Sequence, residues 1–250
     1  MKFVGIIPAR YASTRFPGKP LIDLRGKPMI QRVYERVSEL LDETVVATDD
    51  ERIASAVVGF GGNAIMTSLH HRSGTDRCYE AYTQLKSSYD VVVNIQGDEP
   101  FIRPSQIELL KQCFLENETQ IATLIQAFTP ENTPEDLFNP NTPKVVVNAR
   151  QQALYFSRSV IPYVREKPFS EWLQSHVFYK HIGIYAYKAE ILKELITLSP
   201  SNLEKAESLE QLRWLENGYT ITTRVTQEKT IGIDTPQDLE RALLWLDANK

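Results

Sequence analysis

The feature that most constrains the fold of this chain is an alternation, in its first part, of short β-branched runs with helix-like segments. This βαβ rhythm is typical of parallel strands joined by crossover helices, and so of an α/β protein. The run from Asp90 to Gln96 contains Val91, Val92, Val93 and Ile95, which predicts a central strand covered on both faces. We expect strands at 2–8, 43–48, 63–67 and 90–96 and helices at 28–41, 50–59 and 74–87.

The alternation weakens in the middle of the chain. The segment 130–143 is rich in Pro, Asn and acidic residues and predicts a surface loop, and 162–176 predicts an irregular stretch between two strands. Those two strands indicate an added antiparallel element, and Thr235 and Pro236 are typical of the start of a last helix. The elements expected here are helices at 104–117, 188–198, 203–217 and 236–248, and strands at 119–128, 144–157, 177–187 and 219–226.

Composition narrows the class of protein. The chain has 250 residues, with no internal repeat and no long linker, so we expect one domain over residues 1–250. A formal net charge of -4 argues against a nucleic-acid partner. The start of the chain has no signal-peptide pattern and no apolar run is long enough to span a membrane, so we expect a cytoplasmic protein without membrane insertion. Cys78 and Cys113 form no CxxC pair and are interpreted as small buried residues.

A basic loop follows the first strand. The apolar run Phe3–Ile7 ends at Pro8 and Ala9, and the next stretch carries three spaced cations, Arg10, Arg15 and Lys19. Ligands of open α/β sheets bind at the carboxyl ends of the strands, so these cations are expected to surround a polyanion such as a triphosphate. The alternative is a solvated loop, but Pro17 and Gly18 shape the backbone beside the cations, which a solvated loop does not require. Neither GxxxxGK[ST] nor GxGxxG is present.

Two aspartates suggest a metal. Asp98 directly follows the central strand and should reach the same sheet edge as Arg10. A carboxylate and a triphosphate repel each other unless a Mg²⁺ lies between them, and Mg²⁺ is often held by one or two carboxylates plus phosphates. Asp234, just before the last helix, is the best second ligand. The alternatives are a turn-forming Asp98 and an Asp234 that only adjoins a helix cap.

A second group of polar residues suggests an acceptor. Glu207 and Glu210 are three positions apart in the expected helix 203–217 and would share one face, with Gln211 beside them. An arginine can bind a carboxylate while carboxylates, amide, imidazole and phenol bind hydroxyls, so the set suits a sugar acid. Taken singly, His181 is more often structural and the glutamates solvated. The remaining members of the set are Arg158, His181 and Tyr185.

Other chemistries lack their residues. The four histidines form no HxxxH face for zinc, there is no GxSxG elbow, and neither cysteine has a nearby base. Covalent catalysis therefore has no candidate nucleophile.

These motifs together resemble a known family. PARYASTRFPGKPL, SGTDR, QGDEP, YKHIGIYAY and GIDTPQDL are similar to segments of the sugar nucleotidyltransferases, and in particular of the family that transfers CMP from CTP to 3-deoxy-manno-octulosonate (Kdo). The resemblance covers essentially the whole chain. It implies a Rossmann-like three-layer fold with a mixed, mostly parallel central sheet, dependence on Mg²⁺, a homodimer and a role in lipopolysaccharide precursor synthesis.

The resemblance also implies roles for residues. Residues 1–128 would bind the nucleotide, and 129–250 would supply sugar-binding and dimerisation elements. Catalytic roles fall to Arg10, Lys19, Asp98 and Asp234, of which the two aspartates would bind the metal. The CTP-binding set is Pro8, Ala9, Arg10, Arg15, Lys19, Ser73, Gln96 and Asp98, and the sugar-binding set is Gln96, Arg158, His181, Tyr185, Glu207, Glu210 and Gln211.

Two other functions remain open at this stage. One is a cytidylyltransferase for a related acidic sugar, either sialic acid or an amino-substituted Kdo, which an acceptor screen would distinguish. The other is a nucleotide-sensing module without turnover, against which the presence of both Asp98 and Asp234 argues.

Overall fold

The computed structural model describes residues 1–12, 16–115, 118–228, 232–233 and 235–248. They form two compact units. Unit 1 comprises residues 1–108, 186–196 and 229–250, and unit 2 comprises residues 109–185 and 197–228. The chain passes from unit 1 into unit 2 after residue 108 and later returns to unit 1. The expected change of role near residue 128 stays a prediction.

The core of unit 1 is a parallel sheet. Its strands are β1 (Phe3–Ala9), β2 (Glu43–Thr48), β3 (Ala64–Met66) and β4 (Val91–Asn94), hydrogen-bonded in the order β3-β2-β1-β4. Successive side chains of a strand point to opposite faces, and Val4, Ile6 and Ile7 all have no exposed surface. Both faces of β1 are therefore covered, which gives the three-layer arrangement expected of a Rossmann-like fold.

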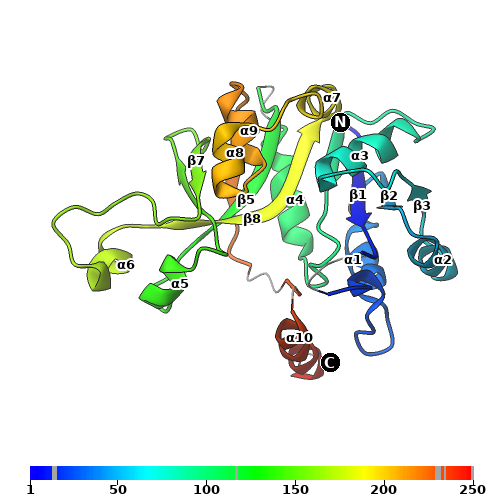
Figure 1. Ribbon diagram of the computed structural model, residues 1–250, viewed down its shortest axis with the longest axis horizontal. Helices are drawn as coiled ribbons and strands as arrows, with labels where there is room; N and C mark the ends of the chain where they lie inside the picture. Colours follow the sequence, from blue (N-terminus) through cyan, green and yellow to red (C-terminus); the bar gives the residue numbers. More distant parts are fainter. Residues whose placement is uncertain (13–15, 116–117, 229–231, 234, 249–250) are drawn as a thin grey trace. The chain divides into compact units, whose positions relative to one another are not determined.

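Helices cover this sheet. Helix α3 packs on β1 and β4, and α2 packs on β2 and β3 (Figure 1). The predicted cap at Thr235 is confirmed, because its side chain accepts the backbone N–H of Asp238. The side chains of Asp50 and Ser73 cap α2 and α3 in the same way. The helices of this unit are η1 (Lys19–Leu21), α1 (Met29–Val37), α2 (Glu51–Gly59), α3 (Gly74–Thr83), the start of α4 (Pro104–Cys113), α7 (Ala189–Leu195) and α10 (Pro236–Ala248).

Unit 2 combines parallel and antiparallel pairing. Strands β5 (Ile121–Ala127) and β9 (Ile221–Val225) are parallel, whereas β6 (Lys144–Val147) pairs antiparallel with both β7 (Ala153–Ser157) and β8 (Tyr179–Lys188). Strand β8 also pairs antiparallel with β5 and with β4. The expected fold class is confirmed: a mixed, mostly parallel sheet with an antiparallel element contributed by the middle of the chain. The helices are the end of α4, α5 (Pro134–Phe138), η2 (Phe169–Glu171), α6 (Trp172–Ser175), α8 (Asn202–Glu207) and α9 (Gln211–Glu216).

Two predictions for the middle of the chain were too simple. The segment 130–143 is not entirely a loop, because Thr133 and Asp136 form a capping box that opens α5, and Leu137 is buried in a cluster with Trp172 and Phe178. The strand expected at 144–157 is a hairpin, β6 and β7, with Gln151 at a positive φ of 59° in the turn.

The helix expected at 203–217 is broken. It ends at Glu207, Ser208 adopts left-handed angles (φ 51°, ψ 48°), and α9 begins at Gln211. The cause is a tertiary contact: Arg158 Nε donates to the Glu207 carbonyl and Nη2 to the Ser208 carbonyl, at 2.6 and 3.2 Å. In a continuous helix those carbonyls would accept N–H groups four residues on. The spacing of Glu207 and Glu210 predicted that they share one helical face. This prediction is wrong, because the two residues lie on either side of the break.

Both cysteines are free and buried, Cys78 in α3 and Cys113 in α4, as expected. Among the described residues no helix is both long and apolar enough to cross a lipid bilayer.

Candidate active site

The ends of β1 and β4 define the candidate site in unit 1. The two strands are parallel neighbours, with Ile6 opposite Asn94, so Arg10 after β1 and Asp98 after β4 emerge at one edge of the sheet. Gly97 allows the two chain segments to approach closely, since a Cβ there would lie 3.1 Å from the Pro8 carbonyl oxygen. This juxtaposition confirms the expectation that the basic loop and QGDEP meet.

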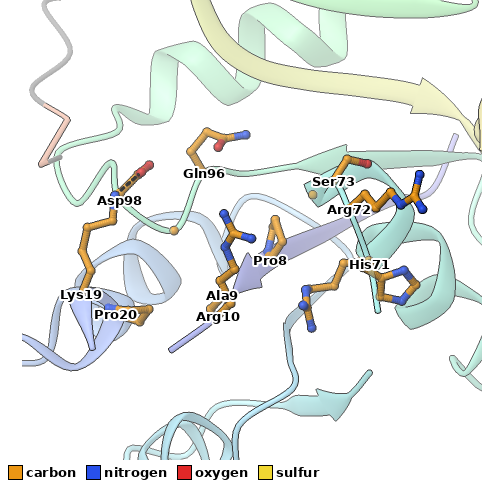
Figure 2. A pocket seen from close by; sticks show the side chains of 13 residues that line it. Pro8, Ala9, Arg10, Lys19, Pro20, His71, Arg72, Ser73, Gln96 and Asp98 are labelled. Atoms are coloured by element: carbon orange, nitrogen blue, oxygen red, sulfur yellow. Dashed lines mark hydrogen bonds and ion pairs between the residues drawn. The ribbon is translucent and has the colours of Figure 1, made fainter. Parts of the chain in front are cut away.

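A pocket of about 280 Å³ opens at this edge (Figure 2). Its lining includes every described member of the predicted CTP-binding set, from four separate segments of the chain. Arg15 lies outside the described residues. The lining residues are Pro8, Ala9, Arg10, Lys19, Pro20, His71, Arg72, Ser73, Gly74, Arg77, Gln96, Gly97 and Asp98.

Lys19 and Asp98 face each other across one side of the pocket. Lys19 Nζ donates to the Asp98 carboxylate at 2.7 Å, and the side chains are 15% and 30% exposed (Figure 2). The loop delivers Lys19 there because Gly18 has a left-handed φ of 70° and its N–H donates to the Tyr11 carbonyl oxygen at 3.0 Å. The lysine then begins η1.

The N-terminus of α3 forms another side. Ser73 Oγ accepts the Asp76 N–H at 3.1 Å, so this hydroxyl already caps the helix. Gly74 adjoins Pro8, since a Cβ there would lie 3.4 Å from Pro8 Cγ. Backbone N–H groups and the positive end of the helix dipole favour an anionic or hydrogen-bonding ligand at such a helix start.

The pocket carries a strong positive charge. Four of its lining residues are Arg or Lys, against the single carboxylate of Asp98. Arg77 is 4% exposed and bound to Asp49 Oδ2 at 2.6 Å, so it belongs to the scaffold. Arg10 and Arg72 have no ion-pair partner among the described residues, and Figure 2 shows Arg10 between the Lys19–Asp98 pair and Ser73. Their charges remain for a ligand, as a triphosphate requires.

Sequence reasoning missed part of this lining. The sequence pattern was considered for His71 only with respect to zinc binding. In the structure His71 lines the pocket, and its Nε2 contacts the Glu80 carboxylate. The Ser68 N–H bonds to that carboxylate and, with His71, holds the pKa of Glu80 below its usual value although desolvation opposes them. Arg72 adjoins SGTDR, so its place beside Ser73 could have been found from the motif. Pro20, Gly74, Arg77 and Gly97 likewise flank the predicted residues.

The metal prediction is only partly accessible, because Asp234 lies outside the described residues. Its neighbour Ile233 is described, and the Ile233 N–H donates to the backbone carbonyl oxygen of Asp98 at 3.0 Å. Ile233 is also buried in a cluster with Phe101 and α10. The described residues contain no group of three or more His, Cys, Asp or Glu that could hold a metal alone. A single partly exposed carboxylate in a cationic pocket still fits Mg²⁺, whose other ligands can be phosphate oxygens.

The other predicted set lies in unit 2, except Gln96, which lines the pocket of unit 1. Glu207 is held at the end of β7: its carboxylate accepts Ser157 Oγ at 2.6 Å and the Arg158 N–H at 2.9 Å. The fully buried Lys144 donates to the Arg158 carbonyl at 2.7 Å, and burial lowers the pKa of its amine. This network fixes the junction between β7 and α8.

Arg158 is largely engaged by the backbone. Besides the Glu207 and Ser208 carbonyls, its guanidinium donates to the Pro140 carbonyl at 2.9 Å. The side chain thus ties three chain segments together. Its predicted contact with a sugar carboxylate stays a prediction.

Two of the predicted residues, His181 and Tyr185, form an aromatic and polar cluster with Trp214. The His181 ring lies 5.2 Å from the Tyr185 ring, which meets Trp214 edge-on at 5.1 Å. Burial lowers the pKa of His181 to about 3, so the ring is neutral near pH 7. Thr123 Oγ1 lies 2.7 Å from the Ile184 carbonyl oxygen and 3.1 Å from His181 Nε2. If the hydroxyl donates to the carbonyl, Nε2 carries the proton and Nδ1 is an acceptor.

Gln211 and Glu210 lie at the start of α9. Gln211 is 5% exposed, and its Nε2 has no hydrogen-bond partner among the described residues. Glu210 lies 3.3 Å from Arg213 Nη2, which is held more closely by Glu204 at 2.7 Å. The Glu207 carboxylate, by contrast, accepts hydrogen bonds from both Ser157 and Arg158.

Comparison with known proteins agrees with this geometry. Residues 4–228 match the family model described as Cytidylyltransferase, which defines the class. A protein of Parabacteroides distasonis named 3-deoxy-manno-octulosonate cytidylyltransferase is 64% identical over 247 residues, covering 98% of each chain. Its namesake in Phocaeicola vulgatus is 65% identical over 246 residues, also covering 98% of each. The chain belongs to the family of 3-deoxy-manno-octulosonate cytidylyltransferases.

A solved structure supports the same assignment. It is described as CMP:2-keto-3-deoxy-manno-octonic acid synthetase complexed with CTP, and it is 45% identical to this chain with a TM-score of 0.91 over 100% of both chains. The Rossmann-like fold class follows from this likeness as well as from the strand order.

Proposed function

We propose that this protein transfers CMP from CTP to the anomeric hydroxyl of Kdo, releasing pyrophosphate. The observation that carries the proposal is the pocket of unit 1, where Arg10 and Lys19 lie with the start of α3 and the strand-end residues Gln96 and Asp98. A cationic pocket at the carboxyl ends of parallel strands suits a nucleoside triphosphate. Family membership supplies the acceptor.

The chemistry follows from charge. The sugar hydroxyl attacks the α-phosphorus in line, the bond to the bridging oxygen breaks, and negative charge grows on the departing pyrophosphate. Arg10 and Lys19 are the cationic donors of the pocket that would stabilise this charge. Catalysis in this account is positioning and electrostatics, with no covalent intermediate on the protein.

We also propose Mg²⁺ as cofactor, with Asp98 and Asp234 as protein ligands. When bound, the ion would neutralise phosphate charge and lower the pKa of the attacking hydroxyl. Because Asp98 accepts a hydrogen bond from Lys19 Nζ at 2.7 Å, Lys19 and the metal ion would compete for this carboxylate. Lys19 released from Asp98 would then be available to phosphate oxygens.

The acceptor is proposed to contact unit 2. Nδ1 of the neutral His181, the Gln211 amide and the Glu210 carboxylate offer an acceptor, a donor and a charged acceptor for sugar hydroxyls. The buried Nε2 of Gln211 supports this, since buried donors without partners are uncommon. Arg158 and Tyr185 complete the proposed set, while the contacts of Glu207 indicate a supporting role.

Three further properties are proposed on the strength of family resemblance. They are a homodimer, a cytoplasmic location and a role in lipopolysaccharide precursor synthesis. Exposed apolar side chains in unit 2 support the first, since Tyr163, Phe169 and Leu154 are 70%, 55% and 59% exposed. Light scattering on the purified protein distinguishes a dimer from a monomer.

The test is an acceptor screen. The protein is incubated with CTP and Mg²⁺ plus Kdo, an amino-substituted Kdo or sialic acid, and pyrophosphate and the nucleotide sugar are measured. We expect CMP-Kdo with the largest kcat/KM, and no product when Mg²⁺ is chelated. A larger kcat/KM with another acid would show that this acid, and not Kdo, is the acceptor. Nucleotide binding without turnover of any of the three acids would show that the protein is a nucleotide-binding module and not a transferase.

A further inference from the structure

Tyr11, in the loop that follows β1, lies beneath an arginine of a different element. The guanidinium carbon of Arg52, in the first turn of α2, is 3.3 Å from the centre of the Tyr11 ring. A cation within about 6 Å of an aromatic centroid is attracted to the negative face of the ring. Neither residue lines the pocket, so this contact belongs to the support of the loop and not to its ligand surface.

The guanidinium is itself fixed. Its Nε and Nη2 donate to the two carboxylate oxygens of Asp50 at 2.9 and 2.6 Å. The same carboxylate accepts the Arg52 N–H at 2.9 Å and caps α2. A two-point hydrogen bond sets the plane of the guanidinium as well as its position. The helix therefore presents a flat, oriented cation to the tyrosine ring.

The tyrosine in turn adjoins the turn that delivers Lys19. A Cβ on Gly18 would lie 3.1 Å from Cζ and Oη of Tyr11, so the ring lies close against the glycine. The Gly18 N–H donates to the Tyr11 carbonyl oxygen at 3.0 Å. Since Gly18 is the residue before Lys19, a displaced Tyr11 would change where the lysine emerges.

We propose that Arg52 and Tyr11 are positioning residues that hold the turn at Gly18, and with it Lys19, in place for binding CTP. The inference rests on the proposed function, because it assumes that Lys19 binds CTP. The connected contacts run from Asp50 through Arg52 and Tyr11 to Gly18. Without the cation, Tyr11 and the turn at Gly18 would sample more conformations, and CTP would have to order them at the moment of binding.

The first test separates CTP binding from chemistry. Arg52→Met keeps most of the side-chain length and removes the charge, while Glu51→Gln alters an exposed neighbour in the same helical turn. We expect KM for CTP to rise about three- to fivefold in Arg52→Met, the scale of one exposed cation–aromatic contact. Neither kcat nor KM for the sugar should change, and Glu51→Gln should match the wild type. An unchanged KM for CTP in Arg52→Met would overturn the proposal.

Two variants refine the test. Arg52→Lys retains a cation but lacks the planar fork, so it should recover only part of the loss. Tyr11→Phe retains the ring and should behave like the wild type. If Tyr11→Phe were as impaired as Arg52→Met, the phenol and not the ring would be responsible, and the stacking account would be wrong.

A second measurement does not depend on activity. Hydrogen exchange of the Gly18 amide reports directly on the bond to Tyr11. We expect this amide to exchange several-fold faster in Arg52→Met than in the wild type or Glu51→Gln, at equal thermal stability. Equal exchange rates would overturn the proposal. If exchange were faster in Arg52→Met but the wild-type protein transferred no CMP, Arg52 would still be shown to support the turn at Gly18, and only the proposed function would be wrong. The two claims can therefore fail independently.

Discussion

At the scale of single residues, the Lys19–Asp98 pair defines the site. Each partner is expected to have a different ligand, a phosphate for the lysine and a metal for the aspartate, yet the two side chains bind each other at 2.7 Å. The two side chains are only 15% and 30% exposed, and the ion pair avoids the cost of a partly buried charge without a counter-charge. Substrate binding must exchange this pair for stronger partners.

The charge of Lys19 can be tested against another lysine of the same segment. Lys19→Met should raise KM for CTP by about 10- to 100-fold, since one charge-assisted contact is worth about 1.5–3 kcal/mol. Lys27→Met is the matched control, because Lys27 pairs with Glu35 at 2.6 Å and does not line the pocket. Steady-state kinetics on both variants decide the matter. If the two substitutions had equally small effects on KM for CTP, the loop that carries Lys19 would be a solvated segment and not a phosphate site.

Residue types near a strand end were predictable, but side-chain partners were not. Arg10, Lys19, Gln96 and Asp98 could be placed at one edge because parallel neighbouring strands end together. The partners of Arg158 could not be predicted, since its guanidinium binds main-chain carbonyl groups, which every residue has. The same holds for Glu207, whose partners are a hydroxyl and an N–H from a distant strand.

At the scale of elements, caps and breaks decide where functional groups face. The sequence predicted the order of the longer helices and strands, because their periodicity is local, but not the short helices α5 and α6. It did not predict the break between α8 and α9, because there a long-range contact from Arg158 outweighs helix propensity. That break separates Glu207 from Glu210 and gives them different surroundings.

The start of α3 can be examined by keeping the cap while changing its charge. Ser73→Asp retains a capping oxygen but adds a negative charge to the pocket, so the melting temperature should hold while KM for CTP rises at least about tenfold. Ser73→Ala should instead lose about 1 kcal/mol of stability with a smaller effect on KM. Thermal melts and kinetics report the two quantities. Equal CTP affinity in Ser73→Asp and the wild type would remove this helix start from the nucleotide site.

The two glutamates should respond in opposite ways. Glu207→Gln weakens two charge-assisted hydrogen bonds and should lower the free energy of unfolding by about 1–3 kcal/mol. Glu210→Gln should raise KM for Kdo with KM for CTP constant, because it removes a charged acceptor proposed to contact the sugar. Denaturant melts and two-substrate kinetics measure these effects. A Glu210→Gln variant with altered CTP affinity alone would mean that the residue serves the other substrate.

At the scale of the whole molecule, charge is unevenly distributed. The chain has a formal net charge of -4, yet its described pocket is lined by four Arg or Lys side chains against one carboxylate. The local excess concentrates a polyanion at one place while the remaining surface stays unattractive to nucleic acid. The pocket belongs to unit 1 and most of the proposed acceptor residues to unit 2. Composition predicted the class of ligand, but the division into two units required the structure.

Stability should depend on pH through His181. Its pKa falls from 6.5 to about 3 on folding, so below pH 6.5 the unfolded chain binds a proton that the folded protein rejects. The protein should therefore lose stability as pH falls from 6.5 toward 3, by about 2 kcal/mol at pH 5. Melting temperatures of the wild type and His181→Gln between pH 7 and 5 test this, because the variant lacks the titration. Parallel curves would show that His181 is not buried as a neutral ring.

A crystal structure of this protein with CTP tests the assignment of the site most directly. We expect triphosphate oxygens within hydrogen-bonding distance of Arg10 and Lys19, with the Lys19–Asp98 bond replaced by these contacts and the nucleoside beside Ser73. A nucleotide bound elsewhere, or bound at this edge with its phosphates away from both cations and the Lys19–Asp98 pair intact, would contradict the assignment of the site.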